Sequence, residues 1–175
     1  RDKICGDGLT PRAVSELVRM GVPTREEDGW IRNIGLRAVA GGRSFEFPWP
    51  ELRSYPSYGL ARSRMNLDQT LAEHARATGA KLMERTNVTG PVVDERTGRV
   101  VGVTARPVDA DGRRAGDEST YRAPVVIAAD GVSARMATSL GIEKAMNRPM
   151  GVAVRTYFTS PRHDDPWMES HLELW

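Results

Sequence analysis

The chain has 175 residues, 39% hydrophobic and 27% charged, which is the balance of a globular chain that forms one domain or parts of two. Its net charge of +2 gives no field strong enough to indicate a nucleic-acid partner. A single cysteine excludes an intramolecular disulfide framework, and three dispersed histidines without a cysteine pair predict no structural metal site.

The sequence also bears on location and on completeness. No apolar run approaches the roughly 18 residues of a membrane-spanning helix, and no signal peptide is evident at the start. We therefore expect a cytoplasmic protein, a setting compatible with peripheral contact on the inner face of the membrane. Because the chain begins with Arg1-Asp2-Lys3 and ends in the strand-like HLELW, we interpret it as an internal fragment.

A short amphipathic helix is predicted after Thr10. Thr10 is a favourable N-cap, Pro11 suits the first helical position, and Gly21 marks the end of the helix. Val14 and Leu17 then fall on one face, which we expect to be buried.

A hairpin and a second helix follow. Residues 30–49 predict two strands around a glycine pair, with Phe45 and Phe47 on one face, and residues 51–59 predict a loop. Asn66 is predicted to cap a helix that continues to about Thr78, with a stripe of leucines at helical spacing.

The next part of the chain predicts an antiparallel meander. Short β-rich pieces are separated by turn residues, and the polar stretch at 109–118 predicts an exposed loop. The pieces are residues 81–88, 91–95, 99–108 and 119–123.

A buried parallel strand is predicted at residues 125–129 (VVIAA), followed by a tight turn, a helix over 133–140 and a further strand over 150–158. Asp130 and Gly131 would lie at the carboxyl end of the buried strand, where ligands of parallel sheets bind. Two interpretations of Asp130 stay open: it accepts hydroxyl hydrogen bonds from a cofactor, or it turns the chain and caps the next helix.

The lone Cys5 stands directly before Gly6-Asp7-Gly8. The glycines permit a loop that comes close to a ligand, and the positive end of the following helix favours an anion or a polar ring edge. The alternative is that Cys5 is a small buried apolar filler. The sequence carries no GxGxxG, GxSxG or phosphate-binding P-loop motif.

Residues 2–14 (DKICGDGLTPRAV) resemble the segment of the geranylgeranyl reductase family, FAD-dependent oxidoreductases, in which a Cys-Gly-x-Gly-Leu-x-Pro-Arg run comes near the flavin. Residues 60–80 are similar to the family's arginine-then-helix segment and residues 125–141 to its Asp-Gly motif. The stretch from residue 150 onward resembles the actinobacterial members that act as menaquinone reductases. The resemblance covers essentially the whole chain.

The resemblance implies an α/β fold with α+β character: part of a p-hydroxybenzoate hydroxylase-like FAD-binding fold with an antiparallel-sheet substrate domain. Residues 1–24 and 63–146 would belong to the FAD-binding domain, and residues 25–62 and 147–175 to the substrate domain. The implied activity is reduction of an isoprenyl double bond in the polyprenyl tail of menaquinone, with FAD as cofactor and an electron donor of unknown identity. The fragment alone is expected to be inactive.

The resemblance also implies roles for particular residues. Cys5 would be catalytic, as a proton donor or as a wall of the pocket. The residues implied to bind the cofactor are Gly6, Asp7, Gly8, Arg64, Asp130 and Gly131. Those suggested to line the substrate are Trp49, Tyr55, Tyr58 and Phe158. The alternatives left open are an FAD-dependent aromatic monooxygenase or halogenase of the same superfamily, and a non-catalytic binding module that keeps the fold without the cofactor.

Overall fold

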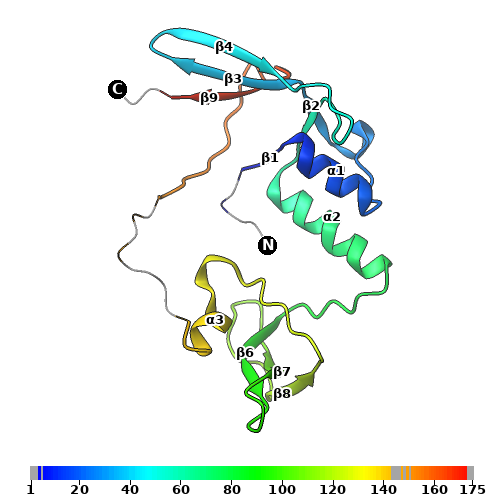
Figure 1. The fold of residues 1–175 in the computed structure, drawn as a ribbon, viewed down its shortest axis with the longest axis vertical. Coiled ribbons are helices and arrows are strands. Elements are labelled where there is room, and N and C mark those ends of the chain that lie inside the picture. Colours follow the sequence, from blue (N-terminus) through cyan, green and yellow to red (C-terminus); the bar gives the residue numbers. More distant parts are fainter. Residues whose placement is uncertain (1–3, 5, 143–146, 148, 150, 173–175) are drawn as a thin grey trace. The chain divides into compact units, whose positions relative to one another are not determined.

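The computed structural model describes residues 4, 6–142, 147, 149 and 151–172 and divides into two compact units (Figure 1). Unit 1 combines Arg1–Lys81 with Gly151–Trp175, and unit 2 is Leu82–Met150. The predicted boundaries between an FAD-binding and a substrate domain stay a prediction.

Unit 1 has its core between two helices and a small antiparallel sheet. The helices are α1 (Pro11–Arg19) and α2 (Arg64–Ala77), and the sheet has the strand order β1-β5-β2. The strands are β1 (Gly8–Leu9), β5 (Gly59–Ala61) and β2 (Ile31–Asn33), and a short 3-10 turn, η1 (Glu26–Asp28), precedes β2. The buried core residues are Val14, Leu17, Val22, Trp30, Leu60 and Leu67.

Helix α1 follows the prediction, but the start of α2 does not. Thr10 is the N-cap of α1 and Pro11 its first residue, as expected. Helix α2 begins at Arg64 with Ser63 as N-cap, so the predicted cap at Asn66 is wrong. The first free N–H of α2 is satisfied by the carboxylate of Asp7, which is 57 positions away in sequence and invisible to a local capping pattern.

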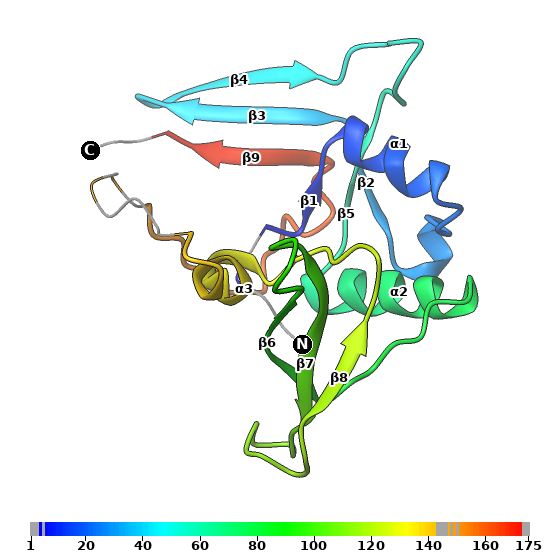
Figure 2. The same cartoon turned by 60° about the horizontal axis from the view of Figure 1, so that its bottom comes forward.

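The second sheet of unit 1 has the order β4-β3-β9. Strands β3 (Gly35–Ala40) and β4 (Arg43–Pro48) form the predicted hairpin, and β9 (Trp167–His171) pairs with β3 in parallel (Figure 2). The strand predicted at residues 150–158 is wrong for residues 151–158, which have no regular structure, and Met150 lies outside the described residues. The second edge of β3 is instead occupied by β9.

Unit 2 contains the predicted antiparallel meander, in the order β6-β7-β8. The strands are β6 (Thr86–Val93), β7 (Val100–Pro107) and β8 (Ser119–Arg122). Strand β6 takes only the end of the first piece predicted before β7 and the start of the second, since residues 81–85 and 94–95 lie outside it, and its pairing shifts register between Val88 and Gly90. The polar loop at 109–118 is confirmed.

The strand predicted at residues 125–129 is wrong. The segment has no regular structure, and Ile127 is 85% exposed. A buried parallel strand needs a neighbour on each side, and no strand in the described part of unit 2 pairs with this segment. The turn and helix that follow are present as η2 (Gly131–Ser133) and α3 (Arg135–Ser139).

Candidate functional site

The candidate site in unit 1 starts at residues 6–8, the segment that leads into β1, because Cys5 lies outside the described residues. The side chain of Met168 on β9 fills the space that a Cβ at Gly8 would need. A Cβ at Gly6, by contrast, would meet no atom within 4 Å. Because the Met168 methyl is the end of a flexible side chain, a Cβ at position 8 would require only a shift of that side chain, and the close approach shows that residues 6–8 lie directly against the second sheet.

Asp7 connects the segment of residues 6–8 to the start of α2. Its Oδ1 accepts a hydrogen bond from the backbone N–H of Arg64 at 2.8 Å, and its backbone oxygen accepts one from the N–H of Arg62 at 3.0 Å. The structure thus brings together two of the predicted cofactor-binding residues, Asp7 and Arg64, and the contact between them is made by the Arg64 backbone. The guanidinium of Arg64 is left for other partners.

The Arg64 guanidinium contains a buried N–H without a partner among the described residues. Its side chain is only 19% exposed, and Nη2 lies 2.7 Å from Oδ1 of Asp68. The Nε atom is buried and has no hydrogen-bond partner within the described part of the chain. Because a buried donor without a partner is costly, this arrangement suits a ligand that supplies an acceptor oxygen, as the phosphate or ribose of FAD does.

A shallow pocket beside α2 is a feature that the sequence analysis missed. Its volume is about 270 Å³, and its lining residues are Pro23, Arg25, Asp28, Trp30, Arg62 and Thr70. The guanidinium of Arg62 stacks over the Trp30 ring at 4.8 Å and donates to the backbone oxygen of Asp28. Arg25 and Asp28 are paired with each other, whereas Nε of Arg62 is buried without a partner in the described part of the chain. The sequence signal for this pocket was the arginine two positions before Arg64.

The aromatic residues suggested for substrate contact have different surroundings. Trp49 donates from Nε1 to Asn33 Oδ1 at 2.7 Å, and Tyr58 packs on the core with Arg32 over its ring at 4.4 Å. Tyr55 is half-buried, whereas Phe158 is exposed. Trp49 and Tyr58 therefore already have structural roles, and their contact with a substrate stays a prediction.

One face of the second sheet is apolar. Leu36 on β3 lies opposite Phe47 on β4 and Met168 on β9, and Phe45 shares that face because it lies opposite Ala38. Leu36, Phe45 and Phe47 are exposed in this structure. Because Met168 also lies against Gly8, the apolar face borders the segment of residues 6–8.

The opposite face of the same sheet carries an ion-pair network. Arg37 on β3 lies 2.5 Å from Asp165 and 3.1 Å from Glu169, and Arg162 lies 2.7 Å from both carboxylates. Hydrogen bonds from Arg37, then from Arg162, hold the pKa of Asp165 well below its ordinary value. Bonds from Arg162, then His171 and Arg37, lower the pKa of Glu169 to about 2. The network fastens β9 to β3.

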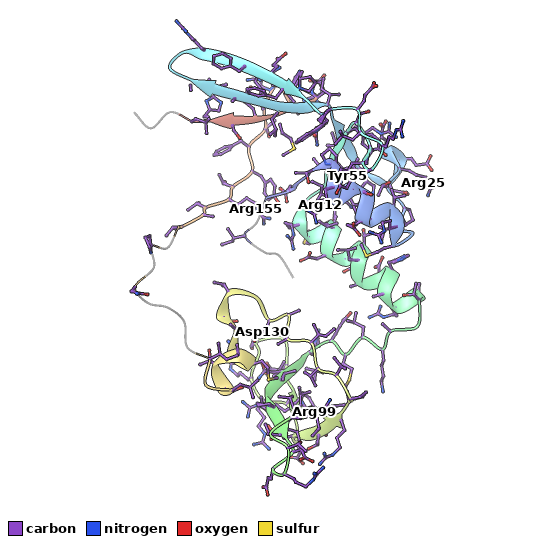
Figure 3. The ribbon with its side chains drawn as sticks, in the orientation of Figure 1. Arg12, Arg25, Tyr55, Arg99, Asp130 and Arg155 are labelled. Carbon is purple, nitrogen blue, oxygen red and sulfur yellow. The ribbon has the colours of Figure 1, made fainter. Side chains whose placement is uncertain are left out.

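In unit 2, Asp130 caps the helix that follows it (Figure 3). Its Oδ2 accepts a hydrogen bond from the backbone N–H of Met136 at 2.9 Å, which lowers the pKa of Asp130 below its ordinary value. Gly131 has a φ of 75°, a backbone conformation that favours glycine. Of the two interpretations of Asp130, helix capping is therefore observed, and cofactor binding by Asp130 and Gly131 stays a prediction.

The sequence is similar to a known protein family and to proteins of named activity. Residues 6–175 match the family described as FAD binding domain. The chain is 40% identical over 174 residues to a menaquinone reductase of Mycolicibacterium smegmatis, covering 99% of the chain and 39% of that relative. It is 36% identical over 88 residues, half of the chain and 20% of the relative, to a digeranylgeranylglycerophospholipid reductase of Methanocella arvoryzae.

The fold is also found in solved structures. A flavoprotein/dehydrogenase of Cytophaga hutchinsonii aligns with a TM-score of 0.68 at 20% identity, covering 85% of this chain and 35% of that one. At this identity the likeness concerns the fold alone, and it confirms the predicted α/β class with an FAD-binding fold. The chain spans less than half the length of these similar proteins.

Proposed function

This chain belongs to the FAD-binding domain family, and from that premise we propose that it forms part of an FAD-dependent reductase that saturates an isoprenyl double bond in the polyprenyl tail of menaquinone. The observation that carries the proposal is the 40% identity to a menaquinone reductase across 99% of the chain. The similarity to a digeranylgeranylglycerophospholipid reductase supports the same class of reaction on an isoprenoid chain.

For the cofactor, we propose that the segment of residues 6–8 and Arg64 contact one edge of FAD. Two observations support this: the buried Nε of Arg64 needs an acceptor, and the carboxylate of Asp7 holds residues 6–8 beside Arg64. In unit 2 we propose Asp130 and Gly131 as cofactor-binding residues, because they resemble the family's Asp-Gly motif. When bound, reduced FAD supplies the hydride.

The chain itself must then supply a proton, because an isolated alkene is a poor electrophile and accepts a hydride only when an acid protonates the other carbon. We propose Cys5 for this role or for a wall of the pocket beside the reacting carbon. Replacing Cys5 by Ser and by Ala separates the two roles. Loss of alkene reduction with FAD retained supports the acid, whereas full activity of the alanine variant contradicts it.

For the substrate, the proposal places the hydrocarbon tail along the apolar face of the second sheet. Leu36, Phe45 and Phe47 present exposed apolar surface there, and burying such surface against a hydrocarbon stabilises binding. We also propose Trp49, Tyr55, Tyr58 and Phe158 as contacts of the substrate. No helix in the described ranges is long and apolar enough to cross a membrane. Access to a lipid-embedded quinone would come from peripheral contact with the bilayer.

The decisive experiment is anaerobic turnover of the protein purified with its flavin, supplied with a chemical reductant and either a polyprenyl menaquinone or geranylgeranyl diphosphate. Mass spectrometry of the lipid should show a gain of one pair of hydrogens in the quinone tail. A gain only in geranylgeranyl diphosphate would move the assignment to another isoprenoid reductase. Absence of either product, with oxygen incorporation into an aromatic compound in air, would favour a monooxygenase.

A further inference from the structure

Arg155 differs from its neighbours along the extended segment that leads to β9. Within residues 151–160, all of which the structure describes, Arg155 alone is half-buried, and its side chain is 14% exposed. Val152, three positions earlier, is 91% exposed. A charged residue is thus the most buried member of a segment rich in apolar residues, the reverse of what side-chain hydrophobicity favours.

Arg155 contacts a carboxylate and an aromatic ring. Its Nη1 lies 3.6 Å from Oδ1 of Asp7, and its guanidinium lies 5.0 Å from the centre of the Tyr157 ring (Figure 3). The same Oδ1 accepts the hydrogen bond from the backbone N–H of Arg64. A single carboxylate oxygen therefore joins three parts of unit 1: the segment of residues 6–8, the start of α2 and the segment before β9.

We infer that Arg155 is a positioning residue that acts through Asp7 to hold the segment of residues 6–8 against the start of α2. The inference rests on the proposed function in one respect, namely that residues 6–8 border the flavin. Without Arg155 the carboxylate of Asp7 would remain half-buried with its charge less compensated. Water would then enter to solvate the carboxylate, and residues 6–8 would be held less firmly. The effect should then appear at the cofactor and not only in global stability.

The test is a double-mutant cycle on the full protein with Asp7→Asn, Arg155→Gln and both together. The readouts are the dissociation constant of FAD and the visible absorption bands of the bound flavin. We expect Arg155→Gln to weaken FAD binding about fivefold and to shift the flavin bands. The double variant should be no weaker than the more affected single variant, because each change removes the same interaction.

Two further variants serve as controls for this cycle. Arg162→Gln removes another arginine of the same C-terminal stretch, one that pairs with Asp165 and Glu169 and not with Asp7, and it should leave FAD binding and the flavin bands unchanged. Arg155→Lys retains the positive charge and should restore most of the lost affinity, which keeps the inference testable even if Asp7→Asn does not fold.

Three results would overturn the inference: additive effects of the two single changes, equal effects of Arg155→Gln and Arg162→Gln, or a lower melting temperature with unchanged flavin bands and FAD affinity. Because these readouts do not involve the quinone, they are independent of the proposed reaction. A wild-type protein that binds FAD but does not reduce the tail would contradict the proposed function and leave the role of Arg155 open to the same cycle.

Discussion

Replacing Arg64 by lysine tests whether its buried Nε faces the cofactor. Lysine keeps the positive charge and leaves the backbone N–H that donates to Asp7 in place, but it removes the Nε donor. Nε is the buried guanidinium atom for which the structure shows no protein partner within the described residues. The substitution therefore deletes the charge-assisted hydrogen bond that Nε would make to a bound ligand; the Nη2 contact with Asp68 is also lost, although a positive charge is kept.

The expected magnitude follows from that single bond. A hydrogen bond to a charged group contributes about 1.5–3 kcal/mol, and each 1.4 kcal/mol is a factor of ten in affinity, so Arg64→Lys should weaken FAD binding roughly 10- to 100-fold. The assay is titration of the apoprotein with FAD, followed by the fluorescence of the free flavin. Arg19→Lys is the matched control, because Arg19 is a 74% exposed arginine on α1.

The reasoning would be refuted by an FAD affinity of Arg64→Lys within twofold of the wild type, or by an equal loss in Arg19→Lys. Either result would mean that Nε does not meet an acceptor of the cofactor. Arg64 would then serve mainly through its ion pair with Asp68 at the start of α2.

Three further predictions concern stability, pH and substrate. Leu60→Ala should destabilise unit 1 by about 3 kcal/mol, because Leu60 is fully buried, whereas Leu52→Ala in the exposed loop should cost less than about 0.5 kcal/mol; hydrogen exchange of α1 amides measures both. The lowered pKa of Glu169 contributes stability that is present above about 4.5 and is lost as the pH falls toward 2, so the melting temperature of Glu169→Gln should fall less steeply over that range. Phe47→Ser should raise the KM for menaquinone several-fold with little change in kcat, as measured by anaerobic turnover; an unchanged KM would exclude the apolar face as the tail site.

The sequence predicted the elements whose signals are local. Thr10, Pro11 and the apolar face of α1 lie within one short stretch, and the hairpin of β3 and β4 is closed by adjacent glycines. The stripe of α2 was also correct, since Leu67 is buried and Leu71 packs against the core. In each case the residues that specify the element are those that form it.

The errors arise where a distant part of the chain supplies the partner. The start of α2 was misplaced because Asp7, and not a neighbouring residue, accepts its first N–H. The segments at 125–129 and 150–158 are apolar enough for strands, but β-structure also requires a pairing edge, which periodicity does not encode. Asp7 and Arg64 were named from sequence motifs and lie in contact, whereas the contact of Asp7 with Arg155 depends on tertiary structure.

The parallel pairing of β9 with β3 has a consequence for how the chain folds during synthesis. Arg37 and Asp165, which fasten the two strands together, are 128 positions apart, and all of unit 2 is made between them. At about 5–20 residues per second, a ribosome needs roughly 6 to 26 s to cover that distance. Throughout this interval the β3 edge is unpaired on the nascent chain, beside the exposed phenylalanines of β4. This interval is when a holdase chaperone would have most effect on the yield of folded protein.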